Sequence, residues 1–212
     1  MKLIGETTIR WYLSAIRPFE LGLARLNIHP NLVTGAGLAV TLLAANFFRI
    51  GYFLWGGLFV GLAGTCDVLD GRVARSTGKK SDFGAFFDST IDRYSDVILF
   101  LGLMIFFNEL YVNVLITLAI TGSLLTSYAR ARAEGLGVDC KIGLMQRPER
   151  ITYMAAAAFF DGLLGSRLDL IFDVEHFLII FVLAFIALMS NITVLQRIIY
   201  LKRTLPDTKQ NI

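Results

Sequence analysis

The chain has 212 residues, of which 55% are hydrophobic and 17% are charged, with a formal net charge of +3. Soluble domains carry about 25% charged residues, so this composition excludes an ordinary soluble domain and indicates a protein that resides in lipid. Its 2 cysteines and 4 prolines also exclude disulfide-rich and collagen-like chains.

The N-terminal residues 1–29 predict an amphipathic helix that lies in the membrane interface. Arg10, Arg17 and Arg25 alternate with apolar side chains such as Trp11 and Phe19, which gives the helix one polar and one apolar face. The same arginines interrupt any apolar run that would suit a signal peptide.

Six apolar segments follow, and a crossing needs about 20 apolar residues. They cover about residues 31–48, 52–75, 83–107, 110–133, 149–164 and 176–200. The fifth is short, and residues 166–175 after it predict a polar link. We therefore expect a single domain over residues 1–212, an all-α integral membrane protein with six transmembrane helices preceded by an N-terminal amphipathic interfacial helix.

Lysine and arginine residues give the expected orientation in the membrane. Nearly all of them fall on the same side as the N-terminus, and only Arg49 and Arg167 fall in connections on the opposite side. Cytoplasmic loops are enriched in these residues. We therefore expect a multi-pass protein of the cell membrane with both termini in the cytoplasm. The inner ends of the second and third spans then face the cytoplasm as well.

Two pairs of aspartates lie at those inner ends. Asp67 and Asp70 are three residues apart and Asp88 and Asp92 four apart, so each pair shares one helix face. Clustered carboxylates repel one another unless a cation lies between them. An all-oxygen set favours Mg²⁺, with Mn²⁺ possible, over zinc. We expect one divalent cation or a pair here, with Arg75 suited to bind a phosphate.

The spacing D-x2-D-G-x2-A-R-x8-G-x3-D-x3-D over residues 67–92 matches the signature of the CDP-alcohol phosphatidyltransferases at every defined position. The chain therefore resembles that family. The resemblance implies a six-helix membrane enzyme, usually homodimeric, of phospholipid biosynthesis. Such an enzyme transfers a phosphatidyl group from a CDP-linked lipid to an alcohol and releases CMP.

The resemblance also implies roles for individual residues. The metal ligands, which hold two Mg²⁺ ions on the pyrophosphate, are Asp67, Asp70, Asp88 and Asp92. Asp92 is also the implied general base that takes the proton of the attacking hydroxyl. The implied contacts to the CDP-lipid are Asn31, Thr34, Gly71, Ala74, Arg75, Ser81 and Gly84.

A basic group near the carboxylates predicts the acceptor. Its expected binding residues are Ser127, Arg130, Arg132, Arg150 and Arg197. Guanidinium groups bind phosphate bidentately, so this much charge favours a phosphorylated alcohol. The Arg-Ala-Glu at 132–134 and the Arg-Pro-Glu-Arg at 147–150 resemble the phosphatidylinositol phosphate and archaetidylinositol phosphate synthase branch, which implies inositol 1-phosphate. Glycerol 3-phosphate is the alternative.

Other interpretations remain open at this stage. Arg130 and Arg147 alone also fit simple topology signals, and Asp96 is expected to pair with Arg93, to cap the helix or to join the chemistry. A divalent cation channel or transporter would use the same carboxylates, but only Asp161 lies in the outer half of a span. A structural membrane scaffold is a further class. The aromatic residues suit lipid contact, so nucleic acid is excluded as a partner.

Overall fold

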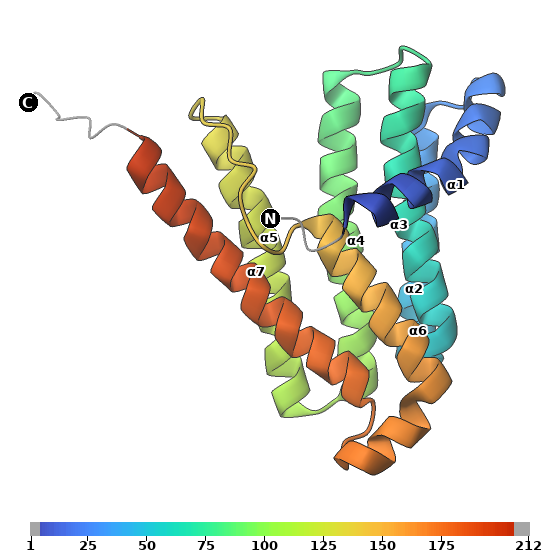
Figure 1. Cartoon of the computed structure of the whole chain (residues 1–212), viewed down its shortest axis with the longest axis vertical. Helices are drawn as coiled ribbons and strands as arrows, with labels where there is room; N and C mark the ends of the chain where they lie inside the picture. The colour runs from blue at the N-terminus through green and yellow to red at the C-terminus, as the bar shows by residue number, and fades with distance from the viewer. Residues whose placement is uncertain (1–4, 206–212) are drawn as a thin grey trace, which may run out of the picture.

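The computed structural model describes residues 5–205, and the chain within this range is helical, with no strand. The helices are α1 (Glu6–Arg25), α2 (Pro30–Arg49), α3 (Phe53–Ser76), α4 (Asp82–Phe107), α5 (Leu110–Glu134), α6 (Arg147–Phe172) and α7 (Phe177–Thr204), as Figure 1 shows. The expected all-α class is confirmed.

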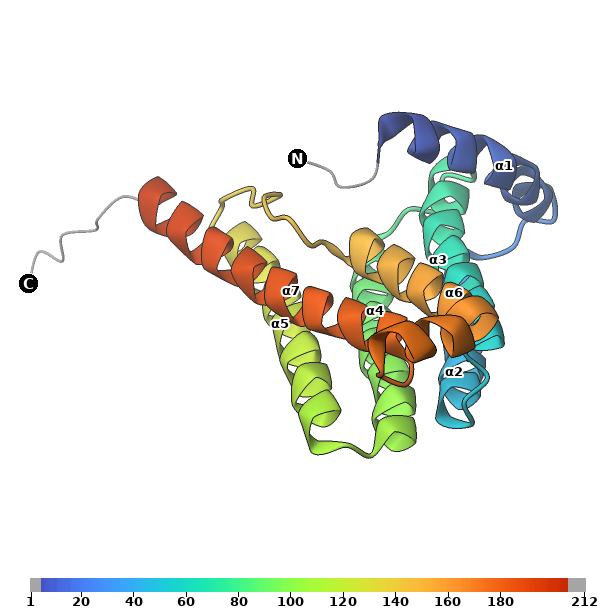
Figure 2. The same cartoon turned by 60° about the horizontal axis from the view of Figure 1, so that its bottom comes forward.

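The helices α2 to α7 form a bundle in which sequence neighbours run antiparallel. The helix α2 packs against α3 and α4, α3 packs against α6, and α5 packs against α7. The pair α5 and α7 forms one flank of the bundle, and α2 and α3 lie on the other side of α4 (Figures 1 and 2). Short connections, such as residues 50–52 between α2 and α3, impose this alternation.

The apolar core lies at one end of the bundle. Its fully buried members include Phe48 at the end of α2, Phe53 at the start of α3, Leu103 near the end of α4 and Ile116 in the first half of α5. Because neighbouring helices are antiparallel, these positions meet at the same depth. The opposite end, where α3 finishes and α4 and α6 begin, is left for polar side chains.

The helix α1 lies across the end of α3, apart from the bundle axis (Figure 2). The Tyr12 hydroxyl donates to Thr65 Oγ1 at 3.0 Å, and Arg72 Nε donates to Glu20 Oε2 at 2.6 Å. Ile16 packs into the small apolar cluster beneath it. The expected N-terminal helix therefore exists over Glu6–Arg25, and residues 1–4 of the expected range lie outside the described part.

Four of the six expected spans meet a membrane-span criterion by length and composition, namely α2, α3, α5 and α7. The other two, α4 and α6, each have 26 residues, and at about 1.5 Å per residue such a helix exceeds the roughly 30 Å hydrocarbon layer. Both carry several charged residues, and such residues count against a helix in that criterion.

The polar link expected at residues 166–175 is wrong for most of its length. The helix α6 continues to Phe172 and ends at Asp173, which adopts a left-handed conformation with φ 53°. Apolar residues such as Leu168 and Ile171 alternate with the charges here, and no proline interrupts the helix. A segment that is too polar for lipid is thus still amphipathic enough to remain helical.

Candidate active site

Three aspartates meet at the polar end of the bundle, as the motif predicted. Oxygen atoms of Asp67, Asp70 and Asp88 all lie within 4.8 Å of one another. The ends of α3 and α4 bring them together, because a connection of residues 77–81 reverses the chain between the two helices. The Ser81 side chain caps α4 by accepting the Gly84 N–H at 3.0 Å, which fixes where α4 begins.

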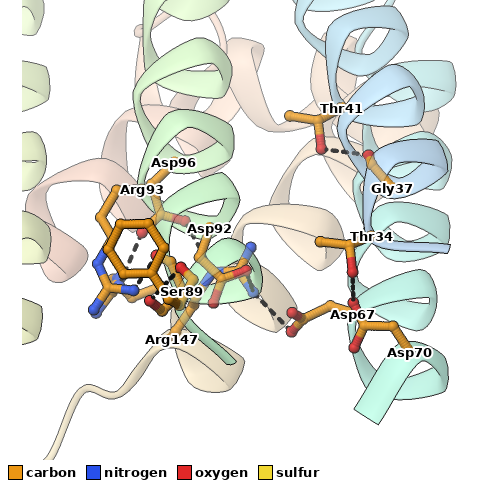
Figure 3. Close-up of polar contacts among 12 residues, drawn as sticks. Thr34, Gly37, Thr41, Asp67, Asp70, Ser89, Asp92, Arg93, Asp96 and Arg147 are labelled. Atoms are coloured by element: carbon orange, nitrogen blue, oxygen red, sulfur yellow. Dashed lines mark hydrogen bonds and ion pairs between the residues drawn. The ribbon is translucent and has the colours of Figure 1, made fainter. Parts of the chain in front are cut away.

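These three carboxylates fit a divalent cation. Asp70 is 5% exposed, and its Oδ2 accepts a hydrogen bond from Thr34 Oγ1 at 2.6 Å (Figure 3). Asp88 Oδ1 is buried without a hydrogen-bond partner among the described residues. A buried carboxylate oxygen without a partner carries a desolvation penalty that a cation removes. The purely oxygen donor set suits a hard cation such as Mg²⁺ or Mn²⁺.

Asp92 lies one turn further along α4 and is held by an arginine rather than by the three-aspartate group. Arg147 Nη1 lies 2.7 Å from Asp67 Oδ2 and 2.9 Å from Asp92 Oδ1, and Figure 3 shows its side chain between the two helices that carry them. The structure therefore brings three of the four predicted ligands together and bridges the fourth to Asp67 through Arg147.

Asp96 joins the same group of charges. Arg150 Nη2 donates to its Oδ2 at 2.9 Å, and Arg147 Nε lies 3.4 Å from its Oδ1. Arg93 does not partner Asp96, because its guanidinium donates to the Ser89 carbonyl. Arg147 was expected either in the basic motif at residues 147–150 or as a topology signal, and its contact with the aspartates was not predicted. The spacing of three residues from Arg150, at the start of a helix, places both on one face and was the available signal.

A cavity of about 150 Å³ adjoins the aspartates. All of the residues predicted to contact the CDP-lipid line it: Asn31, Thr34, Gly71, Ala74, Arg75, Ser81 and Gly84. Asp70, Asp88, Lys79 and Lys80 also line it. A cavity that joins cationic side chains to metal-fitting carboxylates is suited to a pyrophosphate group.

The predicted acceptor residues are less tightly grouped. Arg150 is 3% exposed, and its Nε and Nη1 have no hydrogen-bond partner among the described residues. Arg197 is 2% exposed, and it donates to the backbone carbonyls of Ile142, at 2.9 Å, and Thr126. Arg130 pairs with Glu134 at 2.9 Å on the surface of α5.

The remaining two predicted acceptor residues also lie on α5. Ser127 is half-buried and Arg132 is exposed. Within the described residues, Arg150 is the member of this basic group that contacts a carboxylate of the site, Asp96.

Known proteins are similar to this chain in sequence and in fold. The chain is 35% identical over 157 residues to the archaetidylinositol phosphate synthase of Methanothermobacter thermautotrophicus, covering 73% of this chain and 79% of that protein. It is 30% identical over 200 residues to the phosphatidylinositol phosphate synthase of Cutibacterium acnes, covering 91% and 94%.

Crystal structures of Mycobacterium tuberculosis phosphatidylinositol phosphate synthase, at 28% identity, resemble the fold. The one with CDP-DAG bound has a TM-score of 0.76 and covers 92% of this chain and 96% of that one. The one with manganese and citrate has a TM-score of 0.76 and covers 92% of each chain. The family model for CDP-alcohol phosphatidyltransferases matches residues 27–205. The motif, the cavity beside it and these similarities together establish that the chain belongs to the CDP-alcohol phosphatidyltransferase family, a family of transferases for phosphate-containing groups.

Proposed function

We propose that the protein transfers the phosphatidyl group of CDP-diacylglycerol, or of a diether analogue, to inositol 1-phosphate and releases CMP. The observation that carries this proposal is the cavity beside Asp70 and Asp88, which all of the predicted CDP-lipid residues line. The similar proteins named as phosphatidylinositol and archaetidylinositol phosphate synthases support the acceptor.

The residues divide the reaction between them. Asp67, Asp70 and Asp88, whose oxygens lie within 4.8 Å of one another, would hold divalent cations together with Asp92, and we propose two Mg²⁺ ions, with Mn²⁺ as a substitute. Bound cations would offset the charge that develops on the pyrophosphate oxygens. Thr34 orients Asp70 by its hydrogen bond, and Arg75 adds positive charge from the cavity wall.

Asp92 is the proposed general base. Arg147 engages its Oδ1, which leaves Oδ2 to accept the proton of the acceptor hydroxyl. The hydroxyl oxygen then forms a bond to the phosphorus that carries the diacylglycerol. The bond from that phosphorus to the CMP oxygen breaks, and CMP departs with the electron pair. The proton is transferred to Asp92. Because the acceptor hydroxyl attacks the phosphorus directly, no covalent enzyme intermediate is required.

The basic group favours a phosphorylated acceptor over a neutral alcohol. Arg150 Nε and Nη1, next to the carboxylate group, have no hydrogen-bond partner within residues 5–205, and Arg130 and Arg132 lie at the same end of α5. Guanidinium nitrogens of this kind bind phosphate oxygens. Glycerol 3-phosphate has the same phosphate and is the alternative acceptor.

We further propose six membrane spans, with α4 and α6 included, and α1 in the cytoplasmic interface. The two charged helices pack between the four apolar ones. Asp92 and Asp96 of α4 pair with Arg147 and Arg150 of α6 at the site, as buried intramembrane charges normally do. A homodimer and cytoplasmic termini are part of the same proposal. A cation channel is disfavoured, because Asp161, in the outer half, is already paired with His176.

The test uses purified protein in lipid vesicles with CDP-diacylglycerol and Mg²⁺, and measures CMP release with each acceptor. We expect release with inositol 1-phosphate. Asp92→Asn should lower turnover at least about 100-fold, because general-base catalysis contributes that much, while CDP-lipid still binds. The control is Asp139→Asn, which changes an exposed aspartate paired with Lys141 at 2.7 Å and should leave turnover unchanged.

The outcomes separate the parts of the proposal. CMP release with glycerol 3-phosphate but not with inositol 1-phosphate would show that the proposed acceptor is wrong and the proposed type of reaction is right. An absence of CMP with every alcohol would contradict the transferase activity. Wild-type turnover by Asp92→Asn would contradict the assignment of Asp92 as the general base.

A further inference from the structure

The residues expected to bind the donor and those expected to bind the acceptor come from different parts of the fold. The cavity beside the aspartates is lined by residues of α2, α3, α4 and the connection between the last two. The expected acceptor residues lie on α5, α6 and α7. A residue that positions the second group can therefore affect acceptor binding without altering the cavity for the CDP-lipid.

The connection between α5 and α6, residues 135–146, lies along one face of α7. The contacts pair Thr193 with Met145, Arg197 with Ile142, and Tyr200 with Asp139. The three α7 residues are four and three positions apart, so they share one face of the helix. Their partners follow in the reverse order. The connection is thus held antiparallel to α7 over about two turns of that helix.

Thr193 makes the contact nearest to α6. Its side chain is fully buried, and its Oγ1 accepts the N–H of Met145 at 3.0 Å. The same hydroxyl donates to the Met189 carbonyl of its own helix at 2.8 Å. Met145 is fully buried as well, and a buried N–H that loses its acceptor destabilises the conformation. Thr193 therefore holds the residue that directly precedes the N-cap of α6, Gln146.

The position of the first turn of α6 depends on this contact. Gly143 has φ 134°, and a Cβ there would lie 2.3 Å from Thr193 Cγ2, so only glycine allows the connection to come this close. The Gln146 side chain makes no capping hydrogen bond within residues 5–205. The start of α6 is thus anchored by the residues before it, and Arg150 lies in that first turn.

We propose that Thr193 is a positioning residue for acceptor binding, which anchors the start of α6 so that Arg150 can bind the phosphate of the acceptor. Arg150 is 3% exposed, and its Nε and Nη1 have no hydrogen-bond partner in the described part of the chain. Thr193 acts through Met145 and does not line the CDP-lipid cavity. This role rests on the proposed function, in which the acceptor is phosphorylated.

Thr193→Val tests this role, because valine keeps the branched shape of threonine but cannot accept a hydrogen bond. CMP release in lipid vesicles is measured over a range of inositol 1-phosphate concentrations. We expect KM for this acceptor to rise at least about tenfold, because displacement of a positioned group by about 1 Å costs that much or more. The expected kcat stays within about threefold and the calorimetric affinity for CDP-diacylglycerol within about twofold, since only acceptor binding is weakened.

Two further variants separate positioning from a general loss of packing. Thr193→Ser keeps the hydroxyl and should restore KM close to the wild-type value. Thr204→Val is the matched control on the same helix. Thr204 is exposed and donates to the Tyr200 carbonyl at 2.9 Å, as Thr193 does to its own helix, but within residues 5–205 it accepts no hydrogen bond from the connection. Its KM should equal that of wild type.

Hydrogen exchange followed by mass spectrometry gives a measurement that is independent of turnover. The peptide that contains the Met145 amide should exchange at least about tenfold faster in Thr193→Val than in wild type, because its protecting acceptor is lost. Thr193→Ser and Thr204→Val should exchange at the wild-type rate. Wild-type exchange in Thr193→Val would overturn the proposal, since Thr193 would then not anchor the connection.

The kinetic outcomes are equally decisive. An unchanged acceptor KM in Thr193→Val, or an equal rise in Thr193→Ser, would overturn the proposal. An equal loss of affinity for CDP-diacylglycerol would overturn it too, because it would indicate a general structural defect. If Thr193→Val fails to fold, Thr193→Ala is judged by the same KM, since it removes the hydroxyl without placing a methyl group against the Met145 N–H.

Failure of the proposed function has a different signature. If wild type uses only glycerol 3-phosphate, the same KM comparison is made with that acceptor, because it carries the same phosphate. If wild type releases no CMP with any acceptor, the proposed transferase activity fails. The calorimetric affinity for inositol 1-phosphate then takes the place of KM, and equal affinity in Thr193→Val and wild type would overturn the role of Thr193.

Discussion

At the scale of single residues, Gly71 and Gly162 differ in what surrounds them: Gly71 borders the cavity, whereas Gly162 packs against a neighbouring helix. A Cβ at Gly71 would meet only the Arg75 guanidinium, at 3.5 and 3.9 Å, and Gly71 lines the cavity. A Cβ at Gly162 would lie 2.2 Å from the backbone nitrogen of Leu54. An added methyl group therefore has room in the first case, inside the cavity, and collides with a neighbouring helix in the second.

We expect Gly71→Ala to lower CDP-diacylglycerol affinity at least about tenfold, because the methyl group occupies space that the ligand needs. Its thermal stability should be kept or slightly raised, since alanine is favoured over glycine in helices by about 1 kcal/mol. Gly162→Ala should instead lose about 1–3 kcal/mol of stability by overpacking. Calorimetric binding and thermal unfolding in detergent measure both. Unchanged affinity in Gly71→Ala would exclude Gly71 from the binding surface.

The sequence predicted most of the site at this scale, for a physical reason. Motif residues such as Asp67, Asp70 and Asp88 repeat at helical spacing on two antiparallel neighbours, so spacing alone places them together. Arg147 lacks any such spacing to Asp92, and near a membrane surface an arginine also serves as a topology signal. Only the three-dimensional path of residues 135–146 brings it to the carboxylates.

At the scale of elements, the sequence predicts that each helix is present, but it does not predict where every helix ends. Hydropathy correctly indicated the helices from Pro30 to Glu134, with bounds that differ from the expected ones by a residue or two. It misplaced the end of α6 because it measures suitability for lipid, while helix continuation depends on backbone hydrogen bonds and amphipathic packing. The helix runs on through Arg167 and Asp169 to Phe172.

The junction of α6 and α7 has a buried ion pair at the end of the bundle far from the site. His176 Nδ1 lies 2.7 Å from Asp161 Oδ2, and Asp161 is 4% exposed. The His176 ring centroid lies 4.5 Å from that of Phe53 and 5.2 Å from that of Phe106. This one histidine thus links the connection before α7 to α3, α4 and α6.

His176→Leu should destabilise the protein by about 3–5 kcal/mol, because it leaves the buried Asp161 carboxylate without its partner. In the double variant with Asp161→Asn, part of this loss should be recovered, since no buried charge remains. Thermal unfolding in detergent measures both. Equal stability of the single and double variants would show that the aromatic contacts of His176, rather than the ion pair, hold the junction. CMP release per folded molecule should be unaffected.

At the scale of the whole molecule, the fold separates apolar and charged residues along the bundle axis. The apolar core fills the end where Phe53 and Leu103 meet, and the carboxylates and arginines gather at the opposite end. The sequence predicts this separation because charges occur near the same ends of antiparallel spans. Lysine and arginine should therefore orient the whole molecule with the site toward the cytoplasm.

Cysteine labelling in whole cells tests that orientation. With Cys66 and Cys140 replaced by alanine, single cysteines are introduced at Arg49, at the exposed end of α2, and at Lys141, in the exposed connection before α6. A membrane-impermeant maleimide should label Arg49→Cys in intact cells and Lys141→Cys only after permeabilisation, because the two positions flank opposite surfaces in a six-span arrangement. The reverse pattern would invert the orientation. Labelling of both in intact cells would mean that α4 does not cross the membrane, since one fewer crossing between the two positions moves Lys141 to the side of Arg49.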